Sequence, residues 1–482
     1  MSAAARVERL DDYRWRIPRT GAMRVDGIVY ASDRLMKDLV GDPALEQVAN
    51  VACLPGIVGV SLAMPDAHWG YGFAIGGVAA FDAEEGVVSP GGVGYDINCG
   101  VRLLGSHLDR DQVRPEIESL VTALFDAIPT GVGSHRREEI LSPREERDLL
   151  VRGAAWAVER GYGGASDLES IEGGGVLPGA DPAVVSERAL ERGRSQVGTL
   201  GSGNHFVEVG YVDEVYDDAA AAAFGLRRDG VTVMIHSGSR GLGYQVCDDA
   251  VKEMVKAAAK HGIVLPDRQL CCAPLRSPEA KAYLAAMACA ANYAFANRQR
   301  MAHGVREAFE RALGMGPRDH GLRTVYDVCH NVAKFETHEV DGKPRKVCVH
   351  RKGATRAFPP GHPDVPSRYR HTGQPVLIPG DMGRYSYVLA GAAGSMRETF
   401  GSSCHGAGRV MSRMAAKRAG RGRSILSELA ARGVSIRSAG MATIAEEMPE
   451  AYKDVADVVD VVHGAGLSRK VARIVPMGVI KG

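Results

Sequence analysis

A glycine-rich stretch around residue 405 contains the first candidate for nucleophilic chemistry. It reads Ser403-Cys404-His405-Gly406-Ala407-Gly408-Arg409, and the pattern after it predicts an amphipathic helix over 405–419 with a basic face. A helix start favours a bound phosphate through its unpaired N–H groups and partial positive charge. His405 could attack a phosphorus atom, because neutral imidazole is a good nucleophile. A purely structural helix start also fits this stretch, since glycine loops are weak signals.

Further candidates for chemistry are three histidines, an aspartate and a cysteine. His205, His236 and His330 each stand at the end of a predicted strand or in a glycine loop, beside other polar groups. Asp96 and Cys99 are three positions apart in the loop Asp96-Ile97-Asn98-Cys99. This spacing lets both side chains reach one ion from a tight turn.

These five residues have the chemistry of a metal site. Thiolate and imidazole with a carboxylate suit Zn²⁺, Mn²⁺ or Fe²⁺ better than Mg²⁺ or Ca²⁺. A carboxylate that bridges two ions would make a two-metal site, which stabilises the attacking and leaving oxygens in phosphoryl chemistry. Taken singly, each histidine could instead be a satisfied strand-end residue and Cys99 a buried apolar thiol. Spacing alone does not show that the five residues meet.

The composition is that of an ordinary globular protein and excludes several classes. The chain has 482 residues, of which 45% are hydrophobic and 24% charged, and its formal net charge is +1, so any basic surface must be local. No apolar run approaches the roughly 18 residues of a membrane span, and the N-terminus lacks the apolar region of a secretory signal. The nine scattered cysteines have no CxxC spacing. A disulfide framework is therefore not expected, and we predict a cytoplasmic protein.

The elements that must position these residues are strands and helices in irregular alternation. Because regular βαβ order, internal repeats and long linkers are lacking, we predict one α+β domain spanning residues 1–482. The patterns predict strands at 58–64, 75–81, 205–211, 231–236, 322–350, 375–378, 385–390 and 470–480, and helices at 43–52, 143–160, 243–260, 277–314, 405–419, 424–432 and 446–463.

Several motifs are spread along the chain. They are Met64-Pro65-Asp66-Ala67-His68, the run 92–102 that contains Asp96 and Cys99, the runs 201–208 and 236–241, His350-Arg351-Lys352-Gly353-Ala354-Thr355-Arg356, Cys404–Arg409, and the closing Gly478-Val479-Ile480-Lys481-Gly482. Together they resemble the motifs of the RtcB family of RNA-splicing ligases. The match runs in order from about residue 20 to the last residue. Seven motifs in register make it specific.

The resemblance implies an enzyme that uses GTP and Mn²⁺, with two ions expected. Such an enzyme joins an RNA 3′-phosphate or 2′,3′-cyclic phosphate end to a 5′-hydroxyl end through a histidine–GMP intermediate, in tRNA splicing or RNA repair. The family fold is a single α+β domain with the metal and nucleotide site in a central cleft. The resemblance also suggests a monomer and an activating protein of the archease type.

The resemblance assigns roles to particular residues. His405 falls on the guanylylated nucleophile, and Asp96, Cys99, His205, His236 and His330 fall on the metal ligands. The expected guanosine-nucleotide contacts are Asn204, His205, Phe206, Val207, Glu208, His330, Asn331, Pro379, Gly380, Asp381, Met382, Ser386, His405, Gly406, Ala407, Gly408, Tyr452 and Lys481. One departure is Asp381, where the family usually has serine; its carboxylate could accept a hydrogen bond from the nucleotide or repel phosphate.

Two other functions are compatible with parts of this pattern. A metal-dependent phosphodiesterase that opens cyclic phosphates would need the metal residues but not His405, Phe206 or Lys481, so their presence argues against it. The other alternative is a non-catalytic RNA-binding protein that has kept the fold. Such a protein would not need the metal ligands, so the presence of all of them argues against it.

Local clusters of positive charge are the expected RNA contacts, because the net charge is near zero. The candidates are Arg351, Lys352 and Arg356 in one predicted loop, Arg240, and Arg409, Arg413, Lys417 and Arg418 along the predicted helix after His405. Arg240 and Arg409 are expected to bind the terminal phosphate by forked hydrogen bonds. Lys417 and Arg418 could equally form an ordinary solvated face.

Overall fold

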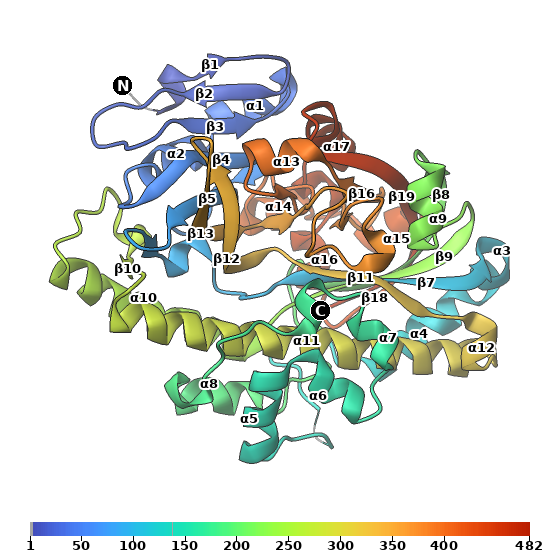
Figure 1. Cartoon of the computed structure of the whole chain (residues 1–482). Helices are drawn as coiled ribbons and strands as arrows, with labels where there is room; N and C mark the ends of the chain where they lie inside the picture. The colour runs from blue at the N-terminus through green and yellow to red at the C-terminus, as the bar shows by residue number, and fades with distance from the viewer. Residues whose placement is uncertain (1–2, 137) are drawn as a thin grey trace.

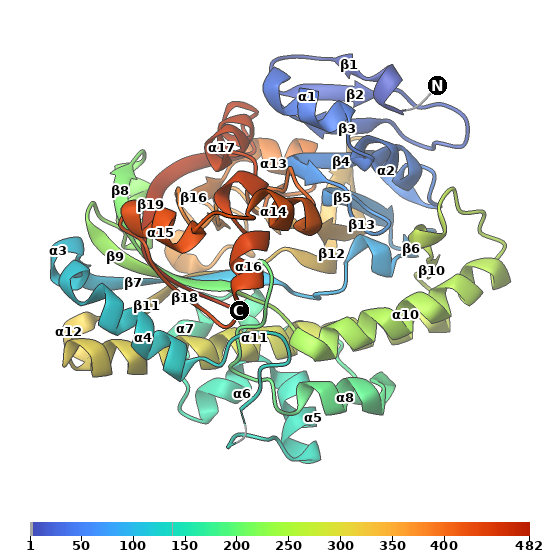
Figure 2. The ribbon, with the colours of Figure 1, turned by 180° about the vertical axis from the view of Figure 1, so that it is seen from behind.

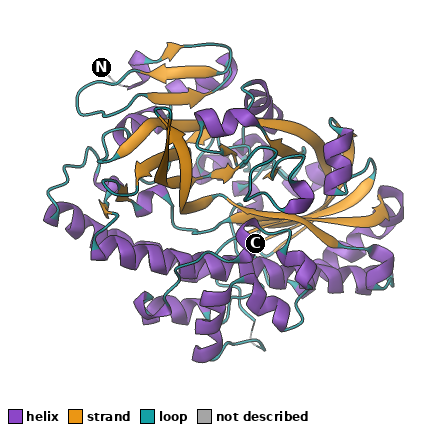
Figure 3. Cartoon of the chain, in the orientation of Figure 1, coloured by secondary structure: helices purple, strands orange, loops and turns teal. Residues whose placement is uncertain are grey.

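A computed structural model of the chain describes residues 3–136 and 138–482. It confirms the predicted mixture of helix and sheet: the strands form the upper layers in Figure 1, and long helices run beneath them. Figure 3 shows the same division by secondary structure. Within the described residues, no helix is long and apolar enough to cross a membrane.

The first large sheet is built mainly from the N-terminal part of the chain. Its order is β1-β2-β3-β4-β5-β13-β12, and every neighbouring pair is antiparallel except β3 and β4. The strands are β1 Glu8–Arg9, β2 Arg14–Ile17, β3 Gly27–Tyr30, β4 Ile57–His68, β5 Ile75–Asp82, β12 Asn331–Val340 and β13 Lys343–Lys352.

The second large sheet crosses the centre of the molecule. Its order is β11-β7-β9-β8-β19-β16-β15, and β18 adds to β19 in parallel. The strands are β7 Gly100–Asp109, β8 Phe206–Val215, β9 Gly230–Ser237, β11 Arg323–Cys329, β15 Pro375–Ile378, β16 Ser386–Gly391, β18 Ser435–Ser438 and β19 Ser468–Lys481. Two small sheets pair β6 Val87–Val88 with β10 Ala273–Pro274, and β14 Ala354–Arg356 with β17 Ser402–Cys404.

The helices cover the lower face of the central sheet and fill the spaces between strands. The longest, α11 Pro278–Leu313, runs beneath β7 and β9 beside α10 Arg240–Lys260, and both views show α5, α6 and α8 below it (Figures 1 and 2). The others are α1 Asp33–Val40, α2 Ala44–Val51, α3 Arg110–Val113, α4 Ile117–Ala127, α5 Pro143–Arg152, α6 Ala154–Glu159, α7 Ala165–Leu168, α8 Glu187–Gly193, α9 Asp218–Phe224, α12 Pro317–His320, α13 Ala393–Glu398, α14 Arg413–Ala419, α15 Ile425–Ala431, α16 Met441–Glu446 and α17 Val455–Gly464.

Three predicted helices differ in the structure. The helix expected over 405–419 begins only at Arg413, where the Ser412 side chain accepts a hydrogen bond from the N–H of Ala415. The helix expected over 143–160 is broken at Gly153, which has a φ of +56°. The helix expected over 446–463 begins only at Val455 as α17, and residues 447–454, which include Pro449, separate it from α16.

Candidate active site

Strand register brings the predicted metal residues to one place. Cys99 immediately precedes β7, and His205 immediately precedes β8. In the antiparallel ladders, His236 on β9 lies opposite both Val101 of β7 and Phe206 of β8. His330 is the single residue between β11 and β12, and Cys329 pairs with Gly100. The four side chains therefore start from adjacent strand ends.

Each of the five donor side chains lies within hydrogen-bonding distance of at least one other. The Sγ of Cys99 lies 3.4 Å from Nε2 of His205 and 3.3 Å from Nε2 of His236. His236 Nε2 is 3.3 Å from His330 Nε2, and Asp96 Oδ2 is 2.9 Å from His205 Nε2. Two overlapping groups could each hold an ion, Cys99 with His236 and His330, and Asp96 with Cys99 and His205. Cys99, a thiol rather than a carboxylate, is the donor shared by both.

The electrostatics of this cluster fit a divalent cation. Burial lowers the pKa of His236 and of His330 well below the ordinary value, so both rings are neutral and keep a lone pair. Burial, followed by the charge of Asp96, raises the pKa of Cys99 well above its ordinary value. His205 Nδ1 lies 3.0 Å from the Leu200 carbonyl, which directs Nε2 into the cluster. A bound cation would supply the positive charge that Cys99 needs to ionise.

His405 lies in a loop after β17, where a buried carboxylate holds it. Asp66 Oδ2 accepts from His405 Nδ1 at 2.6 Å and from the backbone N–H groups of His405 and Gly406 at 3.0 and 3.2 Å. Burial alone would raise the pKa of Asp66, but the charge and hydrogen bonds of His405 leave it below its ordinary value. His405 Nε2 is thereby left as the nitrogen available for chemistry. The His405 and His330 ring centroids are 4.7 Å apart.

Asp66 is a residue to which the sequence assigned no role. It stands in β4, and its neighbours are fixed by Lys453, whose Nζ donates to the carbonyls of Pro65 and Ala67 at 3.0 and 2.7 Å. The one signal in the sequence was the motif Met64–His68, which carried the resemblance without a function for its aspartate. The contact with His405 spans more than 300 residues, so no local pattern could reveal it.

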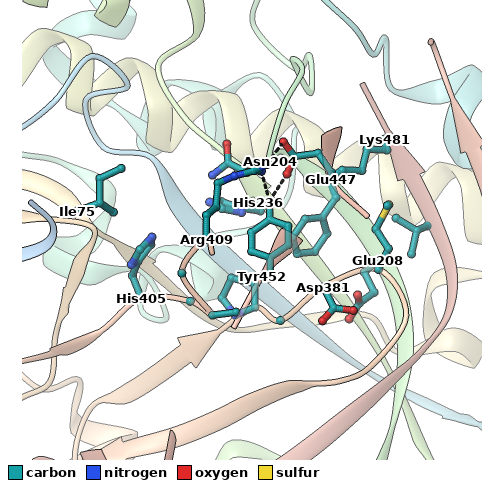
Figure 4. Close-up of a pocket in the computed structure, with 18 of the residues that line it drawn as sticks. Ile75, Asn204, Glu208, His236, Asp381, His405, Arg409, Glu447, Tyr452 and Lys481 are labelled. Carbon is teal, nitrogen blue, oxygen red and sulfur yellow. Dashed lines mark hydrogen bonds and ion pairs between the residues drawn. The ribbon is translucent and has the colours of Figure 1, made fainter. Parts of the chain in front are cut away.

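A pocket opens beside His405 (Figure 4). Of the predicted nucleotide contacts, Asn204, Phe206, Glu208, Pro379, Gly380, Asp381, Met382, His405, Gly406, Ala407, Gly408, Tyr452 and Lys481 line it. His68, Ile75, His236, Arg409, Arg413, Glu447 and Val479 complete the wall. The sequence therefore identified most of this pocket, but it missed His68, Ile75, Glu447 and Val479.

Five predicted nucleotide contacts do not line the pocket. His205 and His330 belong to the donor cluster, and Val207 is buried in the core on the opposite face of β8. The Asn331 side chain bonds the backbone of Asp96 and Gly353, at 3.0 and 2.8 Å. Ser386 donates to Glu208 at 3.4 Å and accepts from the N–H of Gly380 at 3.1 Å.

Two acidic side chains of the pocket have raised pKa values but different partners. Burial, aided by the charge of Asp381, raises the pKa of Glu208 to about 8. Asp381 is an ion-pair partner of Arg384 and accepts from the N–H of Gly383 at 3.0 Å. The charge of Arg384 therefore offsets that of Asp381, the residue that stands where a serine was expected. Lys481, opposite Phe206 in the ladder, has its Nζ 5.5 Å from the Phe206 ring centroid.

Arg409 is held by residues of the pocket wall. Its Nη1 lies 3.1 Å from the buried carboxylate of Glu447, and its guanidinium carbon lies 5.0 Å from the Tyr452 ring centroid. The Tyr452 hydroxyl also donates to Glu447. Arg409 therefore faces the pocket as an already paired cation.

The predicted RNA-binding cluster at 351–356 is wrong. Arg351 and Lys352 lie on β13 and Arg356 on β14, and all three are buried. Arg351 forms two 2.8 Å hydrogen bonds with Glu336. Arg356 pairs with Glu172 at 3.3 Å, and Lys352 donates to backbone carbonyls, including that of Gly91 at 3.1 Å. Their charges are used inside the fold, so none is offered to RNA.

The remaining predicted RNA contacts lie closer to the site. Arg240 donates from Nε to Thr199 Oγ1 at 3.0 Å and from Nη2 to Ser134 Oγ at 3.2 Å. Its charge adds to that of His205 in lowering the pKa of Asp96. On α14, Lys417 pairs with Glu446, whereas the Arg418 side chain is exposed.

Known proteins are similar to this chain over almost its whole length. The family model described as "tRNA-splicing ligase RtcB" matches residues 47–482. The chain belongs to the RtcB family. A "tRNA-splicing ligase RtcB" of Thermococcus kodakarensis is 57% identical over 477 residues, covering 99% of both chains. One from Archaeoglobus fulgidus is 57% identical over 478 residues, again 99% of both. An "RNA-splicing ligase RtcB" of Mycobacterium tuberculosis is 55% identical over 438 residues, 90% of this chain and all of that protein.

Membership of the RtcB family confirms the resemblance found in the sequence. The match begins at residue 47 in the family model, later than the residue near 20 from which the motifs were traced, but the archaeal relatives cover 99% of the chain. All five donor residues and His405 fall within the matched range.

Proposed function

We propose that this RtcB-family protein is a GTP- and Mn²⁺-dependent RNA ligase. It joins RNA 3′-phosphate or 2′,3′-cyclic phosphate ends to 5′-hydroxyl ends, in tRNA splicing or RNA repair. The observation that carries the proposal is the place of His405. Asp66 holds the ring on one side, the His330 ring is 4.7 Å away, and the pocket lined by most of the expected nucleotide contacts opens beside it.

The first step is formation of a histidine–GMP phosphoramidate. His405 Nδ1–H donates to Asp66, so the lone pair of Nε2 attacks the α-phosphorus of GTP. The new N–P bond forms as the P–O bond to the β-phosphate breaks, and pyrophosphate leaves. Asp66 stabilises the positive charge that develops on the imidazole.

The guanylyl group then passes to RNA. An oxygen of the RNA 3′-phosphate attacks the phosphorus and releases His405 as neutral imidazole. The 5′-hydroxyl oxygen attacks the activated 3′-phosphorus, loses its proton, and displaces GMP to close the backbone. A cyclic phosphate is first opened by water to give the 3′-phosphate. Asp96, Cys99, His205, His236 and His330 would hold Mn²⁺, which supplies Lewis-acid stabilisation of charge on the phosphate oxygens.

The pocket has the groups needed to select guanine. Phe206 and Tyr452 offer aromatic faces, Glu208 can accept from the guanine N–H groups, and Lys481 can donate to the carbonyl or to phosphate. Adenine would present donors and acceptors in the wrong places, leaving buried groups unpaired. Asn204, also in the wall, would stabilise an α-phosphate oxygen by donating a hydrogen bond to it.

The alternatives are weaker for reasons visible in the site. A cyclic phosphodiesterase without ligation has no use for a histidine held by a buried carboxylate beside a nucleotide pocket. A non-catalytic RNA-binding protein has no use for five convergent donors. The matched relatives carry ligase names, which supports ligation. A cytoplasmic location, a monomeric state and an archease-type activator belong to the same proposal.

The proposal is tested by incubating the protein with Mn²⁺ and GTP labelled at the α-phosphate. Wild-type protein is expected to acquire an acid-labile label, and His405→Ala is expected to acquire none and to seal no 3′-phosphate ends. The variant should still bind Mn²⁺, because His405 is outside both donor groups. Labelling of His405→Ala to the wild-type level would refute the nucleophile assignment.

A further inference from the structure

The middle of α11 carries a guanidinium that contacts the segments holding the candidate metal ligands. Arg298 is fully buried. Its Nη1 donates to the backbone carbonyl of Asn98 at 2.8 Å and to that of Ser237 at 2.9 Å. Asn98 immediately precedes Cys99, and Ser237 immediately follows His236. One nitrogen therefore fixes the backbone beside two donor residues.

The other edge of the same guanidinium fixes a third segment. Nε and Nη2 of Arg298 donate to Asp327 at 3.0 and 2.8 Å. Asp327 is on β11, three residues before His330, and it also accepts from Arg102 Nε of β7 at 2.8 Å. Arg298 and Asp327 are both fully buried, and this forked pairing fixes direction as well as distance.

The loop between Asp96 and Cys99 depends on α11 for its shape. Asn98 has a left-handed backbone, with a φ of +51°, which is uncommon outside glycine but is adopted by asparagine more readily than by most residues. Its Oδ1 accepts from Arg298 Nη2 at 3.0 Å, and its Nδ2 donates to the Ala291 carbonyl at 2.6 Å. Both ends of this amide are thus bound to the same helix.

We propose that Arg298 is the positioning residue of the metal centre. Its five N–H donors hold the ends of β7, β9 and β11 in the one arrangement that brings Cys99, His236 and His330 together. The inference rests on the proposed function only in requiring that this cluster binds a divalent cation. Lysine would keep the charge but could not reach three acceptors in a fixed plane. The effect of losing Arg298 should therefore appear in coordination geometry, beyond any effect on stability.

The test measures metal binding by the purified protein in the absence of RNA and GTP. Co²⁺ serves as the optical probe, because a cysteine thiolate ligand gives it a charge-transfer absorption, and Mn²⁺ is titrated in parallel. For Arg298→Lys we expect affinity for both ions to fall about 10–100-fold, as is typical when a partner outside the ligands is lost. The thiolate–Co²⁺ absorption should also change in position or intensity.

A matched control lies two residues further along the same helix. Arg300 is also buried, but it pairs with Glu139 at 2.7 Å instead of with the strand ends. Arg300→Lys should lower the melting temperature yet leave the Co²⁺ spectrum and affinity as in wild type. If Arg298→Lys does not fold, Asn98→Gly carries the test, since glycine tolerates the left-handed backbone and only the amide contacts are lost.

Two results would overturn different statements. A folded Arg298→Lys protein with wild-type affinity and an unchanged Co²⁺ spectrum would refute the positioning role and leave the proposed function standing. A wild-type protein that binds neither Co²⁺ nor Mn²⁺ would instead refute the metal dependence on which the proposed function is built. A lower melting temperature with an unaltered spectrum would show that Arg298 acts only in stability, which also refutes the inference.

Discussion

Two buried carboxylates near His405 illustrate how their surroundings decide their chemistry. Asp66 receives three hydrogen bonds and lies beside His405, so its pKa falls despite burial. Burial, aided by the charge of Asp381, raises the pKa of Glu208 to about 8, because its one hydrogen bond, from Ser386, offsets only part of the effect. Asp66 is therefore anionic near neutral pH, while much of Glu208 in the free protein carries a proton.

The affinity for GTP should depend on the proton of Glu208. If the carboxylate accepts the guanine N–H groups, binding below pH 8 requires loss of that proton, so affinity rises with pH up to the pKa of about 8 and then levels off. The slope can reach about tenfold per pH unit. The slope is measured by equilibrium binding of GTP across this pH range, with wild type and with Glu208→Gln. Titration of GTP itself affects both proteins alike, so the difference between their slopes belongs to Glu208. Equal slopes in both proteins would contradict the assignment of Glu208.

Cys99 is shared by both donor groups, so its loss should remove metal from both. We expect Cys99→Ala to weaken Mn²⁺ binding by at least about 100-fold, because a methyl group cannot replace a thiolate ligand. Cys348→Ala is the control, since Cys348 is a buried core thiol outside both groups. Bound Mn²⁺ per folded protein distinguishes them, and unchanged stoichiometry in Cys99→Ala would mean that Cys99 only fills the core.

At the level of single residues, the sequence showed which side chains could do chemistry better than it showed which side chains contact one another. A thiol, three imidazoles and a carboxylate pointed to metal chemistry, but it was the family resemblance that assigned the five residues to one metal site. Asp66 could not be assigned, because its partner His405 is 339 residues away and only the fold brings them together.

Among the local elements, the turn after β17 has the greatest effect on the site. His405 is presented by a loop instead of a helix start, and the loop closes against β4 at Gly408, which has a φ of +76°. A Cβ on Gly408 would come within 2.2 Å of the Asp66 carbonyl oxygen. The close approach of these two backbones keeps Asp66 under the imidazole.

Gly408→Ala should therefore impair guanylylation without affecting the metal. The clash displaces Asp66 from His405, and a misplacement of this kind can cost about 100-fold in rate. Gly422→Ala is matched in backbone, with a φ of +77°, but has no atom within 4 Å of the added carbon. Both variants pay the left-handed penalty of about 1–2 kcal/mol. If the labelling rates of the two variants are equally slow, the contact with Asp66 is not the cause.

The elements also show where sequence patterns misled. The basic run at 351–356 has the composition of an RNA-binding loop, yet it forms β13 and β14 inside the protein. Glu336 pairs with Arg351 across the neighbouring strand, and Glu172 reaches Arg356 from a distant segment. The partner of a buried charge is a tertiary property. The helix predicted over 405–419 failed over its first part for a related reason, since Gly408 makes a close backbone contact with β4.

For the molecule as a whole, a near-zero net charge leaves RNA recognition to a few placed cations. Arg240→Lys should slow ligation of 3′-phosphate ends by about tenfold or more while affecting histidine–GMP formation less, because lysine loses the forked hydrogen bonds. Separate assays of labelling and ligation distinguish the two effects. Equal loss of labelling and ligation in Arg240→Lys would assign Arg240 to the nucleotide or the fold.

Paired substitution of Lys417 and Arg418 should weaken RNA binding uniformly and reduce its salt dependence. A binding assay over a range of salt concentrations measures both effects.

The core draws on distant parts of the chain, and one domain over residues 1–482 stays a prediction. One hydrophobic cluster combines Ala3, Leu62, Val349, Leu389 and Val459, which come from the whole length of the chain. This mixing follows from the sheet order, which the sequence did not predict because strand pairing between distant segments has no local signature.

The position of His330 has a mechanical consequence. The chain leaves the central sheet at Cys329 and enters the other large sheet at Asn331, with this single histidine between them. Its N–H donates to the Cys99 carbonyl at 2.9 Å, and its carbonyl accepts from Ala354 at 3.2 Å. The backbone of His330 is therefore fixed at the junction of the two large sheets. A small rotation of one sheet against the other would change the distances between His330 and the other donor atoms, so the geometry of the candidate metal site depends on the angle between the sheets.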